Sequence, residues 1–207
     1  DNAPWGDKRV RQALSMAMDR QGYLDVLDPT GTNPWNSFFG PALVPYYMSP
    51  EDPKWGDTAK YFKHDPAEVK ALLNAATGSD TIDVNMISNV DRYGATAQQA
   101  WELVASDVRS SGINAQNVYQ EYGAYIQSSY FGKITDPGAI TLGHLFGTVL
   151  DPDDIFMACY WSGSARHNWA GTTIPEMAEL DTMFLKQRTL LDIEERAEYV
   201  QDIQRKM

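Results

Sequence analysis

Cysteine, histidine and basic side chains are scarce in this 207-residue chain. Cys159 is the only cysteine, so no internal disulfide can form. The three histidines, His64, His144 and His167, show no zinc-ligand spacing. Lysine and arginine number 17 against 28 aspartates and glutamates, which gives a formal net charge of −11. This balance disfavours nucleic acids and anionic membrane surfaces as partners, because both attract basic proteins.

Long apolar runs and enzyme motifs are absent from the sequence as well. No stretch approaches the roughly 20 apolar residues of a membrane-spanning helix. No Gly-x-Ser-x-Gly elbow occurs, and no glycine-rich phosphate loop precedes a lysine. No secretory leader is present, but a chain that starts at Asp1 is expected to be processed or excised, so the compartment stays open. We expect no cofactor, no bound metal and no enzymatic activity.

Residues 28–60 combine many prolines with many large aromatic side chains. Six of the eleven prolines fall here. Proline fixes the backbone and removes a hydrogen-bond donor, which excludes a helix interior or a central strand. A disordered linker would not carry so many aromatic residues. We predict a long ordered loop on the surface, with these aromatic residues: Trp35, Phe38, Phe39, Tyr46, Tyr47 and Trp55.

Hydrophobic periodicity along the chain alternates between the helical and the strand pattern. Asp7 and Asp65 stand where helix N-caps are expected, the second followed by proline and, two residues later, glutamate. The alternation predicts an α/β fold with a mixed sheet flanked by helices. The predicted helices cover residues 7–24, 66–77, 97–108, 123–131, 177–191 and 193–207, and the predicted strands cover 82–86, 113–119 and 139–146.

Five segments, in order along the chain, resemble motifs of one protein family. The first is Asp-Lys-Arg-Val-Arg-Gln-Ala-Leu at 7–14, which runs on into Asp19-Arg20. The family is that of the family 5 extracellular solute-binding proteins, the peptide- and nickel-type receptors of ABC importers. The other segments include Asp-Pro-Asp-Asp-Ile-Phe and Asn-Trp-Ala-Gly, and they are found at 61–76, 101–113, 151–156 and 168–197.

The resemblance implies a fold of two lobes that close over a solute, of which residues 1–207 would form the second, C-terminal lobe as a single domain. It implies a monomeric protein in the periplasm or on the outer face of the cell membrane, and leaves lipid anchoring of the full-length protein open. The expected partners are a small solute, an oligopeptide or oligosaccharide, and the membrane permease of an ABC importer.

Ligands of α/β domains bind beyond the carboxyl ends of strands, which directs attention to the turn after strand 139–146. We predict stacking contacts from aromatic residues there, single hydrogen bonds from Thr and Asn, and a carboxylate clamp from Arg. Each of these residues could equally be ordinary core or surface. The predicted ligand-binding residues are Phe146, Thr148, Trp161, Arg166 and Asn168.

Two positions depart from the peptide-binding members that the chain resembles. Those members carry an aspartate three residues before the Asp-Pro pair, where it receives the peptide's amino group, and tend to carry a tryptophan three residues earlier. Here the two positions are Thr148 and Leu145. A buried ammonium needs a paired charge, which threonine lacks. An oligosaccharide-specific member of the family is therefore an alternative.

Two alternatives come from other functional classes. A hydrolase would use Asp151 or Asp153, which stand close together at 151–154. Paired catalytic acids need a convergent geometry that a sequence cannot show, and an Asp-Pro turn explains the same residues. A protein-interaction module would use the aromatic loop 28–60 as its docking surface, and this requires its aromatic side chains to be exposed.

Overall fold

The structure, a computed structural model, describes residues 3–28, 30–31, 37–89, 91–130, 136, 138–141, 149–164 and 174–207. The chain divides into two compact units, unit 1 (Asp1–Asn33 and Lys60–His144) and unit 2 (Pro34–Ala59 and Leu145–Met207). That residues 1–207 form one lobe stays a prediction. None of the helices within the described residues combines the length and the hydropathy that crossing a membrane requires.

Two short helices open unit 1 where the periodicity predicted one. Helix α1 (Lys8–Ala17) begins after Asp7, whose carboxylate accepts a hydrogen bond from the Arg9 amide at 2.8 Å. Helix α2 (Arg20–Leu27) begins after Asp19, which caps it by accepting from the Gly22 amide at 3.0 Å. The single helix over 7–24 was therefore wrong. The apolar pattern runs through the break, but Asp19 satisfies the amides of a new helix.

Helix α3 (Pro66–Thr77) has the boundaries that its capping residues predicted. The Asp65 carboxylate accepts from the amides of Ala67 and Glu68 at 3.1 and 3.0 Å. The helix ends at Gly78, whose φ of 81° is open to glycine at little cost. In this segment the local sequence alone determines the local structure.

Unit 1 contains a parallel three-stranded sheet in the order β2-β1-β3. Strand β1 (Ile82–Ser88) pairs with β2 (Ile113–Tyr119) and with β3 (Ile140–Thr141). The α/β class is confirmed, although the pairings of the described residues are all parallel where a mixed sheet was expected. Residues 142–146 of the predicted strand 139–146 lie outside the described part.

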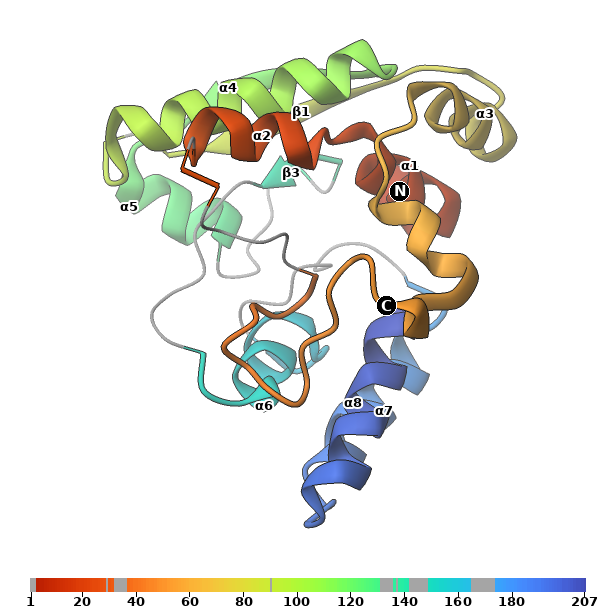
Figure 1. Ribbon diagram of the computed structural model, residues 1–207. Helices are drawn as coiled ribbons and strands as arrows, with labels where there is room; N and C mark the ends of the chain where they lie inside the picture. The colour runs from red at the N-terminus through yellow and green to blue at the C-terminus, as the bar shows by residue number, and fades with distance from the viewer. Residues whose placement is uncertain are drawn as a thin grey trace. The chain divides into compact units, whose positions relative to one another are not determined.

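Helices cover this sheet and enclose the core of unit 1. Helix α4 (Gly94–Ser110) links β1 to β2 and packs against β2, while α1 packs against α3 and α2 against α4 (Figure 1). A 3₁₀ turn, η1 (Pro4–Gly6), precedes α1. Helix α5 (Tyr122–Tyr125) follows β2 and continues as the π-helix η3 (Ile126–Tyr130). The main buried side chains are Val10, Ala13, Met16, Val69, Leu73, Val84, Met86, Ala105, Val108, Ile113 and Ala115.

The described part of the aromatic loop is an ordered series of turns that ends in the 3₁₀ segment η2 (Pro53–Phe62). Phe39, Tyr46 and Trp55 are buried, and Phe38 and Tyr47 are half-buried. The docking-surface alternative required these side chains to be exposed, so it loses its support among the described residues. Trp35 lies outside them.

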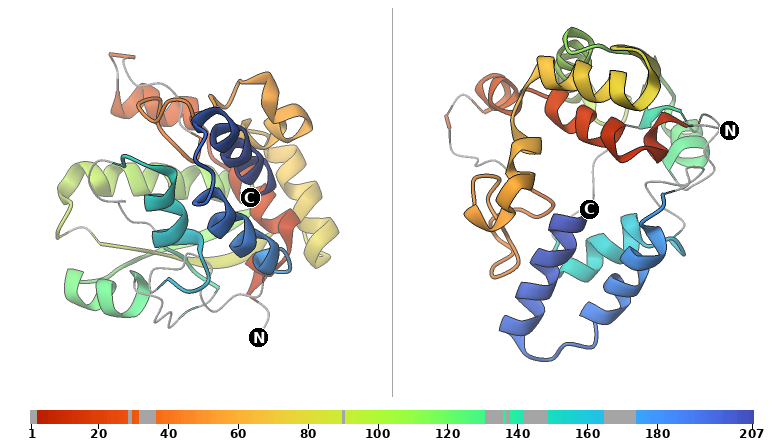
Figure 2. Two further views of the ribbon diagram at one scale, coloured as in Figure 1. Left: turned by 90° about the horizontal axis from the view of Figure 1, so that it is seen from below. Right: turned by 90° about the vertical axis from the view of Figure 1, so that its right-hand side faces the viewer.

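The described part of unit 2 consists of helices and the aromatic loop. Helix α6 (Pro152–Ile155) continues as the π-helix η4 (Phe156–Tyr160). Helices α7 (Met177–Gln187) and α8 (Ile193–Lys206) run side by side in opposite directions (Figure 2). The predicted helix 177–191 is thus too long, and Leu191 is 96% exposed beyond its end.

Aromatic rings hold the core of unit 2 together. The Phe156 ring stacks on that of Phe184, with centroids 5.0 Å apart, and meets the edge of Phe39 at 5.4 Å. Such ring contacts add to the burial of large apolar surfaces. Buried around them are Leu43, Tyr46, Ile155, Leu180, Ala197, Val200 and Ile203.

Candidate functional site

The carboxyl ends of β1 and β2 meet at one edge of the unit 1 sheet. Ser88 and Tyr119, the last residues of the two strands, are register partners. The following segments stay together, because the Gln120 amide donates to the Ser88 carbonyl at 2.9 Å. Ligands of open α/β sheets bind outside this edge. It carries a group of side chains that we name the strand-end cluster: Asn89, Asp91, Arg92, Tyr93 and Tyr122.

A guanidinium that lies over an aromatic ring is the feature of the strand-end cluster best suited to bind a ligand. The Arg92 guanidinium lies over the Tyr122 ring, 5.7 Å from its centroid. Tyr93 meets Tyr122 edge-on at 6.3 Å and Trp101 edge-on at 6.0 Å, and burial raises the pKa of Tyr93. Arg92 is exposed and forms no ion pair with any carboxylate of the described residues. It is thus a positioned cation able to bind an anionic group.

Two polar side chains hold the cluster's backbone. The buried Asn89 side chain donates to the Gln120 carbonyl at 2.9 Å and also to the Asp91 carboxylate. Asp91 in turn accepts from the Tyr122 amide at 3.2 Å. Burial by itself would raise the pKa of Asp91, but the hydrogen bonds donated by Tyr122 and Asn89 outweigh it, so the pKa is lowered. Asp91 therefore stays ionised at neutral pH.

Of the five predicted ligand-binding residues, only Trp161 belongs to the described part. It follows η4, is half-buried, and packs against the core of unit 2. Its indole covers Gly163 so closely that a methyl group there would stand 2.6 Å from Cζ2. Phe146, Thr148, Arg166 and Asn168 lie outside the described residues, and the role of all five stays a prediction.

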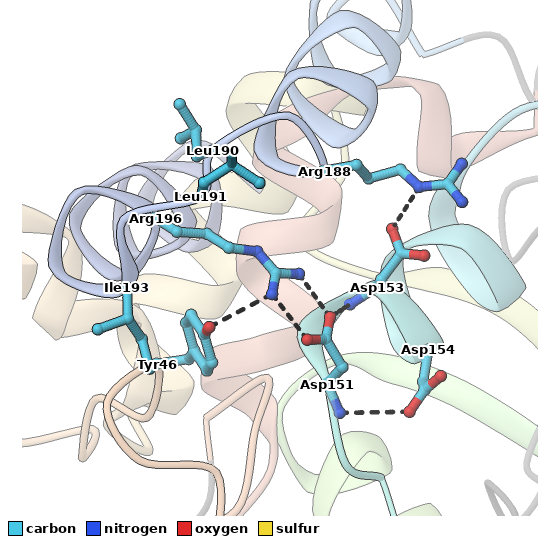
Figure 3. A pocket seen from close by; sticks show the side chains of 9 residues that line it. All are labelled: Tyr46, Asp151, Asp153, Asp154, Arg188, Leu190, Leu191, Ile193 and Arg196. Carbon is cyan, nitrogen blue, oxygen red and sulfur yellow. Dashed lines mark hydrogen bonds and ion pairs between the residues drawn. The ribbon is translucent and has the colours of Figure 1, made fainter.

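Unit 2 has a pocket of about 540 Å³ near the start of α6 (Figure 3). Aspartates from 151–154 and arginines from the α7–α8 end of the unit face it together. The residues that line this unit 2 pocket are Tyr46, Asp151, Asp153, Asp154, Arg188, Leu190, Leu191, Ile193 and Arg196.

Arg196 binds Asp151 through two hydrogen bonds, from Nη1 to Oδ2 at 2.7 Å and from Nη2 to Oδ1 at 2.5 Å. The same guanidinium donates to Gln187 Oε1 and lies over the Tyr46 ring. The hydrogen bonds from Arg196 are the main cause that lowers the pKa of Asp151. Asp151 is therefore an ionised carboxylate held in a structural pair.

The neighbouring carboxylates are engaged as well. Asp153 accepts from Gln187 Nε2 at 2.7 Å and pairs with Arg188 Nε at 3.2 Å. Asp151 and Asp154 form the capping box of α6, which makes the Asp-Pro segment a helix start. A hydrolase would need one of these acids protonated and free, so the contacts of Asp151 and Asp153 argue against that alternative. Within the described residues no three His, Cys, Asp or Glu side chains group as metal ligands.

Curated proteins match most of the length of this chain. Di/tripeptide-binding protein 2 of Pseudomonas aeruginosa UCBPP-PA14 is 26% identical over 173 residues, which are 80% of this chain and 30% of the relative. The dipeptide-binding protein of Pseudomonas aeruginosa PAO1 is 28% identical over 168 residues, 80% of this chain and 29% of the relative. The chain thus spans about 30% of the length of these curated relatives.

A solved structure shows the same fold. The substrate-binding domain of an oligopeptide ABC transporter from Bacillus anthracis superposes with a TM-score of 0.75 at 15% identity, over 98% of this chain and 38% of that one. The family model for bacterial extracellular solute-binding proteins, family 5 middle, matches residues 1–165. The chain belongs to the family 5 bacterial extracellular solute-binding proteins.

Proposed function

We propose that this chain contributes one side of the solute site in an extracytoplasmic binding protein that delivers short peptides to the permease of an ABC importer. The observation that carries the proposal is the exposed Arg92 guanidinium, which lies over the Tyr122 ring at the carboxyl ends of two parallel strands. The di/tripeptide- and dipeptide-binding relatives support a peptide as the solute.

The chemistry of a short peptide fits this feature. Its carboxylate offers two oxygens to the planar fork of a guanidinium, a pairing with strong and directional hydrogen bonds. Contact with the Tyr122 ring restricts the guanidinium before the peptide arrives, so less side-chain entropy is lost when the peptide binds. A hydrogen bond to a charged group is worth about 1.5–3 kcal/mol.

Binding, not turnover, is the proposed mechanism. Peptide contacts made from both lobes would be complete only in the closed form, so the peptide would shift the population toward closure. This chain would supply half of those contacts, and the rest would come from the other lobe of the full-length protein. Peptide capture outside the cytoplasm and hand-over to the permease follow as parts of the same proposal.

Native mass spectrometry of the full-length protein tests the solute class first. A co-purified series of short peptides is expected, which would also mean that a group other than Thr148 receives the peptide's amino end. A glycan or other non-peptide mass would contradict the proposal and revive the oligosaccharide alternative.

Calorimetry with Ala-Ala and Ala-Ala amide then tests the role of Arg92. We expect Arg92→Gln to weaken binding of Ala-Ala by roughly 10- to 100-fold and to leave the amide unaffected, because only the free acid carries the carboxylate. Arg188→Gln removes another exposed arginine, in unit 2, and serves as the control. Equal losses with both peptides would refute a carboxylate contact.

A further inference from the structure

Asp91 and Arg92 are neighbours of opposite charge that do not pair with each other. Both belong to the described residues and both are exposed, yet no ion pair joins them. Both oxygens of Asp91 are occupied instead: Oδ1 accepts from Asn89 Nδ2, and Oδ2 accepts from the Tyr122 amide at 3.2 Å.

Asn89 is fixed firmly enough to hold a neighbour. Its side chain is fully buried. Nδ2 donates to the Gln120 carbonyl at 2.9 Å, and Oδ1 accepts from the Arg92 amide at 3.1 Å. The amide thus ties the segment after β1 to the segment after β2 and places a donor beside Asp91. A buried amide that uses both of its ends in this way has little freedom left to lose.

We propose that Asn89 is a positioning residue that keeps the Asp91 carboxylate away from Arg92, so that the guanidinium stays available for the carboxylate of the solute. The inference rests on the proposed function, because it assumes an anionic group at Arg92. Without Asn89, the exposed Asp91 loses its side-chain hydrogen-bond donor and turns to the cation next to it. An internal carboxylate would then compete with that of the peptide for the same guanidinium.

Three variants of the full-length protein separate this role from a merely structural one. Asn89→Ala is expected to weaken Ala-Ala binding about tenfold and to leave Ala-Ala amide unchanged, since only the acid competes with Asp91. The double variant Asn89→Ala/Asp91→Asn is expected to recover most of the lost affinity, because an amide at 91 cannot neutralise Arg92. Asp91→Asn alone is the reference for this recovery, because it removes the competing carboxylate while Asn89 is still in place.

A merely structural role for Asn89 gives a different pattern. The affinities for Ala-Ala and for Ala-Ala amide would fall together, and the added Asp91→Asn substitution would restore neither. That result overturns the inference. If the alanine variant does not fold, Asn89→Ser, which keeps a shorter donor and acceptor, takes its place with the same expected direction.

The crystal structure of the Asn89 variant decides the inference without any solute. An ion pair between Asp91 and Arg92 within 4 Å, the usual limit for such pairs, is expected. A carboxylate that stays on the Tyr122 amide refutes the inference. If the wild type binds neither Ala-Ala nor its amide, the proposed function fails. The crystal structure of the Asn89 variant still shows whether Asn89 keeps Asp91 and Arg92 apart.

Discussion

Arg196 binds both carboxylate oxygens of Asp151 across 45 residues of sequence, at 2.5 and 2.7 Å. Within unit 2 this pair connects α8 to the N-cap residue of α6. The Arg196 side chain is 17% exposed, and the same guanidinium also donates to Gln187 and Tyr46. It is therefore a desolvated, multiply bonded arginine, unlike a surface ion pair of negligible energy.

Removal of this arginine should destabilise the protein. We expect Arg196→Ala to cost about 1–3 kcal/mol, because Gln187 and Asp151 lose their shared donor in a part-buried setting. The stability of Arg196→Lys should lie between those of the wild type and the alanine variant, since an ammonium group cannot form both parallel hydrogen bonds of the guanidinium. Urea unfolding midpoints measure both. An alanine variant as stable as the wild type would show that the pair adds nothing.

The contribution of Asp151 should depend on pH. Its folded-state pKa lies below the ordinary value of 3.8, mainly because of the hydrogen bonds from Arg196. A lowered pKa stabilises the folded state above pH 3.8, and this contribution is lost as the pH falls from 3.8 through the lower folded value. Asp151→Asn keeps a good N-cap for α6 and removes the charge together with one of the two oxygens that accept from Arg196.

We therefore expect Asp151→Asn to be less stable than the wild type by about 1 kcal/mol at pH 7, a figure reduced for solvent screening at a carboxylate that is 39% exposed. The difference should shrink below pH 3.8 and vanish once the native carboxylate is protonated. Unfolding free energies of both proteins between pH 7 and pH 2.5 provide the test. A difference that stays constant over this range would contradict an electrostatic origin.

Local signals predicted the fold well where they were complete. Asp65, Pro66 and Gly78 fixed both ends of α3, because each acts on backbone groups only a few residues away. The break at Met18 was missed, since the apolar pattern continued across it and the capping by Asp19 competes with that pattern. The π-helices at Ile126–Tyr130 and Phe156–Tyr160 have no local sequence signal that distinguishes them from α-helix.

The candidate site was harder to predict, because its parts come from separate segments of the chain. Arg92 and Tyr122 lie 30 positions apart, and they meet because β1 and β2 are parallel and in register. A signal was present, since the segments at 89–93 and 120–122 come within a few residues of the ends of two predicted strands, 82–86 and 113–119. The expectation that ligands lie beyond strand ends was applied only to strand 139–146, whose far end lies outside the described residues. The Asp151–Arg196 pair had no signal at all.

The N-cap of α3 offers a direct test of local control. Asp65→Ala should cost about 1 kcal/mol of stability, since the amides of Ala67 and Glu68 lose their acceptor. Asp65→Asn, which keeps a capping oxygen, should lose only a few tenths of a kcal/mol. Thermal unfolding of the two variants distinguishes the loss of the cap from the loss of a charge. Equal destabilisation by both would assign the effect to charge.

Gly163 permits a test of Trp161 that leaves the tryptophan itself intact. A methyl group at Gly163 would stand 2.6 Å from Cζ2 and 2.7 Å from Cζ3 of the indole, so Gly163→Ala must move the ring. If Trp161 stacks on the solute as predicted, Ala-Ala binding by the full-length protein should weaken about 3- to 10-fold, the usual worth of an aromatic contact. Gly138→Ala is the matched control, because its nearest neighbour would lie at an ordinary 3.5 Å. A crystal structure that shows a displaced indole together with unchanged affinity would remove Trp161 from the binding site and leave it as part of the unit 2 core.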